Sequence, residues 1–138
     1  MAILVWRDDL SVGHPEIDND HRRLIAIIND FQNTVAKWPA ESVIQEALLG
    51  LESYARWHFE REEAIQAACD FPFLDDHRRQ HAELLNTVAD EIKALFVDKS
   101  RPITAATVQM VAELLKHWLI DHIIKSDLLI RDYLKKAE

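Results

Sequence analysis

Apolar residues recur at three- and four-residue steps along most of the chain, which is the spacing of amphipathic helices. Residues 1–16 lack this spacing and carry Gly13 and Pro15, so we expect an extended arm there. The first periodic stretch covers about residues 17–37. Its inward positions are Ile17, His21, Leu24, Ile25, Ile28 and Val35.

Two further periodic stretches cover about residues 41–68 and 75–97. The segments before them, WPAES (38–42) and CDFPFLDD (69–76), each contain a proline that interrupts helical periodicity. The second stripe contains Ile44, Ala47, Leu48, Leu51, Tyr54, Ala55, His58, Glu62 and Ile65. The third contains His77, His81, Leu84, Leu85, Val88, Ile92 and Leu95.

The fourth periodic stretch covers about residues 104–134, after DKSRP (98–102), and Thr104 is placed to cap it. At about 100° per residue, His117 and Asp121 fall on its solvated face, opposite His122. Asp127 lies roughly 140° from His122, at the margin of the apolar stripe, so spacing leaves its burial open. The stripe consists of Val111, Leu115, Trp118, Leu119, His122, Leu129 and Tyr133.

Four helices joined by short connections predict an all-α, antiparallel up-down-up-down four-helix bundle that follows the N-terminal arm. The scarcity of glycine (2) and proline (4) also favours long helices over a turn-rich β fold. We expect one domain over residues 1–138, because this length, at 49% hydrophobic, suffices to bury a core.

The net charge of -8 argues against nucleic acid or an anionic membrane as the main partner. The apolar start of MAILVWRDD is too short for a signal peptide, and no later stretch is apolar enough to insert into a bilayer. A soluble, cytoplasmic protein is therefore expected. Cys69 is the single cysteine, which excludes an internal disulfide and a cysteine-rich metal cluster.

Five histidines and one glutamate lie on the predicted apolar faces. A lone histidine in such a place is usually a hydrogen-bonded core residue. Each unpaired buried polar group costs about 1–3 kcal/mol, against a total stability of about 5–15 kcal/mol. A group this large would unfold the domain unless something satisfied every member. A first-row transition metal would do so, because imidazole and carboxylate are its ligands. The residues are His21, His58, Glu62, His77, His81 and His122.

At these residues the sequence resembles the hemerythrins, in particular the single-domain bacteriohemerythrins. The order of motifs is H, H-x3-E, H-x3-H and H-x4-D, one on each predicted helix. The resemblance runs from about Trp6 to Tyr133. The matching segments are VGHPEIDNDH (12–21), HFEREE (58–63), HRRQH (77–81) and HWLIDHIIKSD (117–127).

The resemblance implies two iron ions per chain with a bridging oxo or hydroxo group. One iron would be bound by three histidines, the other by two, and Glu62 and Asp127 would bridge them. His14 and His117 match no ligand position, and Asp20 stands where other bacterial members often have glutamine. The implied ligands are His77, His81 and His122 for one iron, His21 and His58 for the other, and the bridging Glu62 and Asp127.

By the same resemblance the expected function is reversible dioxygen binding for transport, storage or delivery, rather than catalysis. The resemblance points to no protein that receives the oxygen. Two alternatives remain open: a di-iron redox enzyme acting on peroxide or nitric oxide, and an interaction protein that responds to oxygen or iron. The implied oxygen pocket consists of Leu24, Phe59, Trp118, Leu119 and Ile124.

Overall fold

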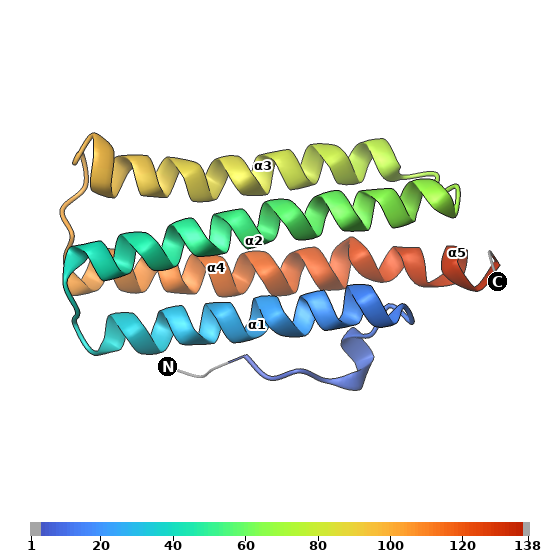
Figure 1. The fold of residues 1–138 in the computed structure, drawn as a ribbon, viewed down its shortest axis with the longest axis horizontal. Helices are drawn as coiled ribbons and strands as arrows, with labels where there is room; N and C mark the ends of the chain where they lie inside the picture. Colours follow the sequence, from blue (N-terminus) through green and yellow to red (C-terminus); the bar gives the residue numbers. More distant parts are fainter. Residues whose placement is uncertain (1–3, 137–138) are drawn as a thin grey trace.

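The computed structural model describes residues 4–136, except for the side chains of residues 123–125 and 135–136. Within that range all regular structure is helical. Four long helices lie side by side and alternate in direction (Figure 1), which confirms the predicted antiparallel four-helix bundle. The long helices are α1 (Pro15–Ala36), α2 (Glu41–Ala68), α3 (Leu74–Ile92) and α4 (Ala105–Lys125). The short elements are η1 (Asp8–Leu10), η2 (Lys93–Val97, a π-helix), η3 (Asp127–Ile130) and α5 (Arg131–Lys136).

Helix α1 begins two residues earlier than its apolar spacing predicts. Pro15 occupies its first turn, where the missing backbone N–H costs nothing. The side chain of His14 accepts a hydrogen bond from the backbone N–H of Ile17 and so caps the helix. His14 therefore has a structural role at the start of α1.

The fourth predicted helix is not continuous. Helix α4 ends at Lys125, Ser126 follows with φ -115 and ψ -56, and the chain continues as the 3₁₀ helix η3. The tighter turn of η3 changes the direction in which the following side chains point. Leu129 is consequently 51% exposed, so the prediction that it faces the core was wrong, whereas Asp127 is fully buried.

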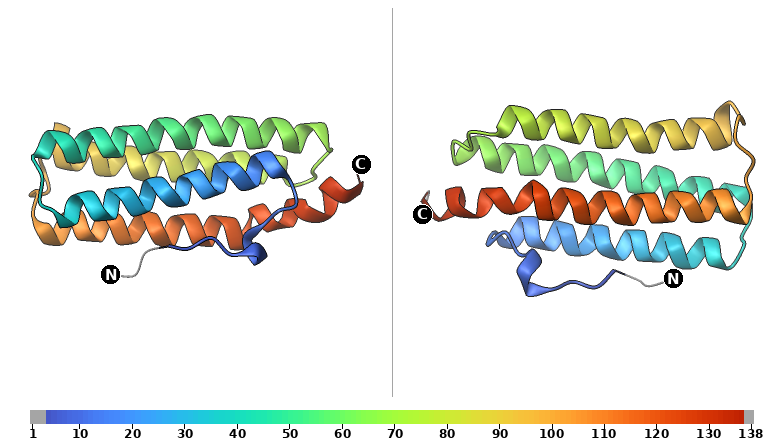
Figure 2. Two further views of the ribbon diagram at one scale, coloured as in Figure 1. Left: turned by 60° about the horizontal axis from the view of Figure 1, so that its bottom comes forward. Right: turned by 180° about the vertical axis from the view of Figure 1, so that it is seen from behind.

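The N-terminal arm lies along α1 (Figure 2) and is tied to it by hydrogen bonds. The backbone of Leu4 exchanges two hydrogen bonds with the side chain of Asn29. The carboxylate of Asp18 accepts the backbone N–H of Val12 at 2.9 Å, and the side chains of Leu10 and Val12 are buried. The arm thereby completes the core on this side of the bundle.

The buried apolar residues form two clusters, one on each side of a band of buried polar side chains. The larger cluster includes Leu48, Leu51 and Leu115. The smaller one, near the C-terminal end of the chain, consists of Val12, Ile17, Phe71 and Ile130. All four long helices contribute to the larger cluster, whereas the smaller one joins residues of α1 and α2 to the connection at Phe71 and to η3 and α5. None of the described helices is long and apolar enough to span a membrane.

Candidate metal centre

Every helix of the bundle sends at least one of the predicted ligands into the polar band. His21 comes from α1, His58 and Glu62 from α2, His77 and His81 from α3, His122 from α4 and Asp127 from η3. Six of these side chains are at most 2% exposed, and His122 is 7% exposed. The burial of Asp127, which helical spacing left open, is decided by the break at Ser126.

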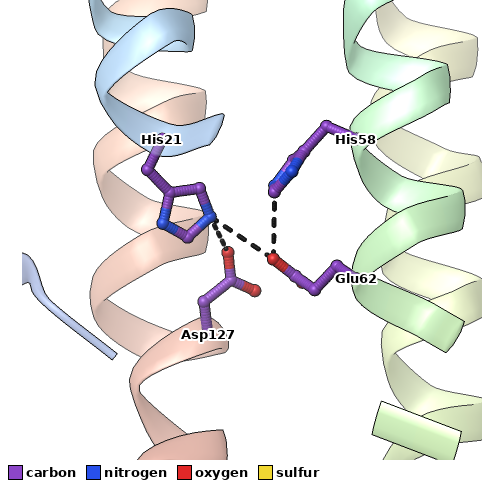
Figure 3. Close-up of side chains that lie close together, drawn as sticks. All are labelled: His21, His58, Glu62 and Asp127. Carbon is purple, nitrogen blue, oxygen red and sulfur yellow. Dashed lines mark ion pairs between the residues drawn. The ribbon is translucent and has the colours of Figure 1, made fainter. Parts of the chain in front are cut away.

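One group of possible ligands lies between α1 and α2, with Asp127 below it (Figure 3). Nε2 of His21 lies 2.9 Å from Oδ2 of Asp127 and 3.3 Å from Oε2 of Glu62. Nε2 of His58 lies 3.2 Å from the same Glu62 oxygen. One ligand atom from each of these four residues lies within 4.8 Å of all the others, close enough to bind a single ion.

A second group contains Glu62, His77, His81 and Asp127, again with ligand atoms within 4.8 Å of one another. Nε2 of His81 lies 3.3 Å from Oε1 of Glu62. Nε2 of His122 lies 2.9 Å from Oδ1 of Asp127 and 3.2 Å from Nε2 of His81, so His122 adjoins this group. Glu62 and Asp127 each direct one oxygen at the first group and the other oxygen at the second.

His77 is held from two sides. The Gln66 amide nitrogen lies 2.5 Å from its Nδ1, and its Nε2 lies 3.1 Å from the carbonyl oxygen of Ser126. The carbonyl can only accept, so Nε2 donates to Ser126 and Nδ1 accepts from Gln66. Burial lowers the pKa of His77, which favours its neutral form.

Two other histidines are held at Nδ1 by carboxylates. Asp20 lies 3.0 Å from Nδ1 of His58, and Glu63 lies 2.8 Å from Nδ1 of His81. Such contacts orient a ligand ring and leave Nε2 available to a metal. Sequence reasoning noted Asp20 only as a departure from the family and missed the roles of Glu63 and Gln66. Glu63 directly follows the predicted ligand Glu62, and Gln66 lies one helical turn after it. This proximity was the signal that the sequence offered for both roles.

Several histidines and both carboxylates in the polar band have shifted pKa values. Burial lowers the pKa of His21, but its contacts with Asp127 and Glu62 outweigh burial and raise the pKa to about 10. Burial likewise opposes charge on His58 and His81, whose pKa values are nevertheless raised by nearby carboxylates. The histidines in turn hold the pKa values of Glu62 and Asp127 below their usual range, against the effect of burial. When no metal is bound, shared protons therefore supply the positive charge that balances two buried carboxylates.

Close approach in this band does not produce well-formed hydrogen bonds. Nε2 of His21, Nε2 of His58, Oε2 of Glu62 and both carboxylate oxygens of Asp127 are buried and lack a well-aligned hydrogen-bond partner among the described residues. Each is nevertheless within 3.3 Å of a carboxylate oxygen or an imidazole nitrogen of another residue in the band. Atoms arranged in this way point toward common centres rather than at one another. The donor set thus fits metal ions better than it fits a hydrogen-bonded network.

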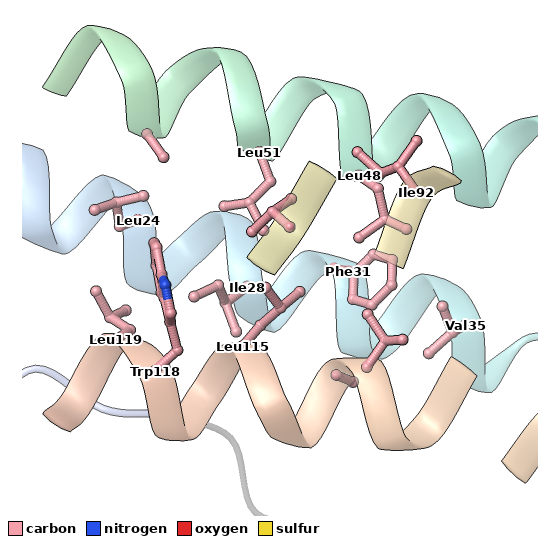
Figure 4. Packing of buried hydrophobic residues seen from close by; sticks show 14 of the residues in the cluster. Leu24, Ile28, Phe31, Val35, Leu48, Leu51, Ile92, Leu115, Trp118 and Leu119 are labelled. Atoms are coloured by element: carbon pink, nitrogen blue, oxygen red, sulfur yellow. The ribbon is translucent and has the colours of Figure 1, made fainter. Parts of the chain in front are cut away.

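The predicted oxygen-pocket residues lie next to the band on the side of the larger cluster. Leu24, Phe59, Trp118 and Leu119 are all buried there, and Figure 4 shows Leu24, Trp118 and Leu119 close together. Phe59 stacks on the His81 ring with centroids 4.0 Å apart. The side chain of Ile124 lies outside the described residues.

Comparisons with known proteins identify the family of this chain. Residues 12–133 match the model of the hemerythrin HHE cation binding domain. The chain belongs to the hemerythrin family. A bacteriohemerythrin of Stenotrophomonas maltophilia is 30% identical over 98% of this chain and 84% of its own length. A bacteriohemerythrin of Pseudomonas aeruginosa is 29% identical over 92% of the chain and 78% of its own length. Among animal hemerythrins, a myohemerythrin of Riftia pachyptila is 30% identical over 86% of the chain and 83% of its own length.

Proposed function

We propose that this protein binds dioxygen reversibly at a pair of iron ions and serves in the transport, storage or delivery of the gas. The observation that carries the proposal is the position of Glu62 and Asp127. Each carboxylate has one oxygen beside each group of histidines, which is the arrangement that two bridged ions require. The names of the bacteriohemerythrin and myohemerythrin relatives support the same function.

In this proposal three histidines bind one iron and two bind the other. Five imidazoles and two carboxylates with two oxygens each would provide nine of the about twelve ligand positions of two such ions, and an oxo or hydroxo group would provide two more. The iron pair would supply the remaining open position for dioxygen and the electrons that dioxygen takes up on binding. The three-histidine set is His77, His81 and His122, and the two-histidine set is His21 and His58.

The neighbouring side chains prepare the imidazoles for this task. Asp20 and Glu63 keep the proton of His58 and of His81 on Nδ1, so that Nε2 is free to bind a metal. His77 needs the same tautomer, in which Nδ1 donates. After rotation of its amide, Gln66 can accept a hydrogen bond from Nδ1–H through Oε1, a buried atom without a hydrogen-bond partner among the described residues.

The apolar side chains beside the centre control what reaches it. Leu24, Phe59, Trp118 and Leu119 offer no charged group to a small molecule on that side. Dioxygen passes such a wall at little cost because it is small and apolar. Water and anions must give up hydration to do so, and their entry is therefore disfavoured. Exclusion of water and anions favours release of dioxygen unchanged over irreversible oxidation of the centre.

Anaerobic reduction of the iron-loaded protein, followed by titration with oxygen, tests the proposal. We expect about two irons per chain and an optical charge-transfer band that appears with oxygen and disappears when oxygen is removed. Steady-state assays with peroxide and with nitric oxide should show no significant turnover. A centre that oxidises irreversibly, or that turns over either compound, would contradict reversible binding as the function.

A further inference from the structure

The candidate metal centre is closed on most sides. Both apolar clusters adjoin it, and six of the seven proposed ligands are at most 2% exposed. A hydrated cation cannot cross an apolar cluster without a large desolvation cost. A loading route must therefore provide polar groups along its length.

One cleft meets this requirement, between α3 and α4. It has a volume of about 480 Å³, and it reaches the buried side chains of His122 and Ser126. Among the described residues, α3 and α4 approach each other less closely than the pairs α1–α2, α2–α3 and α1–α4. The residues that line this α3–α4 cleft are Gln80, Glu83, Leu84, Thr87, His117, Trp118, Asp121, His122 and Ser126.

His122 separates the cleft from the centre. Its Nε2 is 2.9 Å from Asp127, and the same residue lines the cleft. His58, His77 and His81 are each held at Nδ1 by another side chain. The polar contacts of His122 with Asp127 and His81 both run through Nε2.

The outer part of the cleft favours cations. Its lining includes the carboxylates of Glu83 and Asp121 and the imidazole of His117, and no lysine or arginine is among the described residues that line it. Glu83 and His117 are exposed. Carboxylates at the mouth of a cleft raise the local concentration of cations, while a neutral imidazole can exchange with bound water on a divalent metal ion.

We propose that the α3–α4 cleft is the route by which divalent metal ions reach the centre. Glu83, His117 and Asp121 collect the hydrated ion, and rotation of the His122 side chain admits it. His122 then closes the route by becoming a ligand itself. This inference rests on the proposed metal centre, but it concerns the path of the ion and is independent of what the loaded centre does with oxygen.

The rate of cobalt(II) uptake tests the contribution of the carboxylates. Metal-free protein is mixed with cobalt(II) at low ionic strength, and the visible absorption of the bound ion is followed. The variant carrying Glu83→Gln and Asp121→Asn should take up cobalt about three- to tenfold more slowly, and added salt should reduce the difference. The control carries Asp30→Asn and Glu46→Gln, which change the net charge equally at exposed positions on α1 and α2.

A plug in the cleft tests the route itself. Thr87→Trp places a large side chain in the cleft, and Ser53→Trp, at an exposed position of α2, is the matched control. Because uptake and release share one path, the Thr87 variant should also release cobalt more slowly from the fully loaded protein into excess chelator. This second measurement does not depend on a folded metal-free form.

Slow uptake by both cleft variants, with the same final cobalt content as the controls, is the expected result. Uptake and release as fast as in the controls, at full cobalt content, would overturn the route and leave the proposed centre intact. Failure of the unaltered protein to bind cobalt would instead overturn the centre on which the route depends.

Discussion

At the scale of single residues, five positions along α4 separate a solvent-exposed histidine from a proposed ligand. His117 is exposed on the rim of the α3–α4 cleft, whereas His122 is buried and contacts Asp127. Five residues of α-helix correspond to a rotation of roughly 140°, which is enough to move a side chain from solvent to core. Two residues of the same type therefore have different environments and different expected effects on mutation.

Substitution of these two histidines should separate their roles. His122→Ala removes an imidazole from the proposed three-histidine iron site and leaves a polar gap in the core, so iron content and the oxygen-dependent spectrum should both be lost. His117→Ala changes an exposed side chain, for which the free energy of unfolding usually changes by less than about 0.5 kcal/mol. Iron analysis and oxygen titration of both variants provide the measurement. Equal loss of equilibrium iron content in the two variants would contradict the assignment.

The side chains behind the ligands also contribute at this scale. Asp20 lies 3.0 Å from Nδ1 of His58 and 3.4 Å from Nε of Arg61, which in turn contacts the exposed Glu16. Asp20→Asn removes the negative charge that supports His58, and loss of such a partner typically weakens metal binding by about 10–100-fold. Competition between the protein and a coloured chelator for zinc measures this directly.

Glu16→Gln is the control for Asp20→Asn, because it removes a carboxylate from the same Arg61 without touching a proposed ligand. We expect zinc affinity to stay within about twofold of the unaltered protein, as for an exposed ion pair. If both variants weakened zinc binding equally, the effect would reflect net charge near Arg61 rather than support of His58.

At the scale of secondary structure elements, the break at Ser126 has the largest consequence. Helix α4 ends three residues after His122, and η3 begins with the buried Asp127. The hydroxyl of Ser126 donates to Oε1 of Gln80 at 2.5 Å, which ties the break to α3. The change of helix type lets one segment provide a histidine and a carboxylate to the same centre.

The break predicts which of the neighbouring residues Leu129 and Ile130 tolerates replacement by a charged residue. Leu129→Lys should change the free energy of unfolding by less than about 0.5 kcal/mol, because Leu129 is 51% exposed. Ile130→Lys should cost several-fold more, since Ile130 is 1% exposed in the smaller apolar cluster and a lysine there would bury a charge. Denaturant unfolding of the two variants measures the difference. The reverse order would indicate a continuous fourth helix.

At the scale of the whole molecule, the bundle closes around a set of charges that only a cation satisfies well. Two fully buried carboxylates are balanced by shared protons when no metal is bound, and several of their oxygens lack aligned hydrogen bonds. The two apolar clusters surround this polar band and stabilise the remainder of the bundle. Metal binding and folding are therefore expected to be coupled.

Removal of the metal should strongly lower the melting temperature. A ligand present at a thousand times its dissociation constant stabilises the native state by about 4 kcal/mol, and for a chain of this size that corresponds to a shift of about ten degrees or more. Thermal melts of metal-free and metal-loaded protein in the same buffer provide the test, with metal restored to the stripped sample as the control. Equal melting temperatures would show that the buried donors do not need a metal.

Local spacing was sufficient for the four-helix bundle and for the inward positions of His21, His58, Glu62, His77, His81 and His122. All of these follow from a constant rotation per residue within an uninterrupted helix. The burial of Asp127, the exposure of Leu129 and the sharing of Glu62 between two groups did not follow from spacing.

The contacts of Asp20, Glu63 and Gln66 with the histidines, and the α3–α4 cleft, join residues on different helices. Such contacts depend on how far one helix is shifted and rotated against its neighbour, and on where a helix breaks. Packing of the complete bundle sets both quantities, so they can be read only from the tertiary structure.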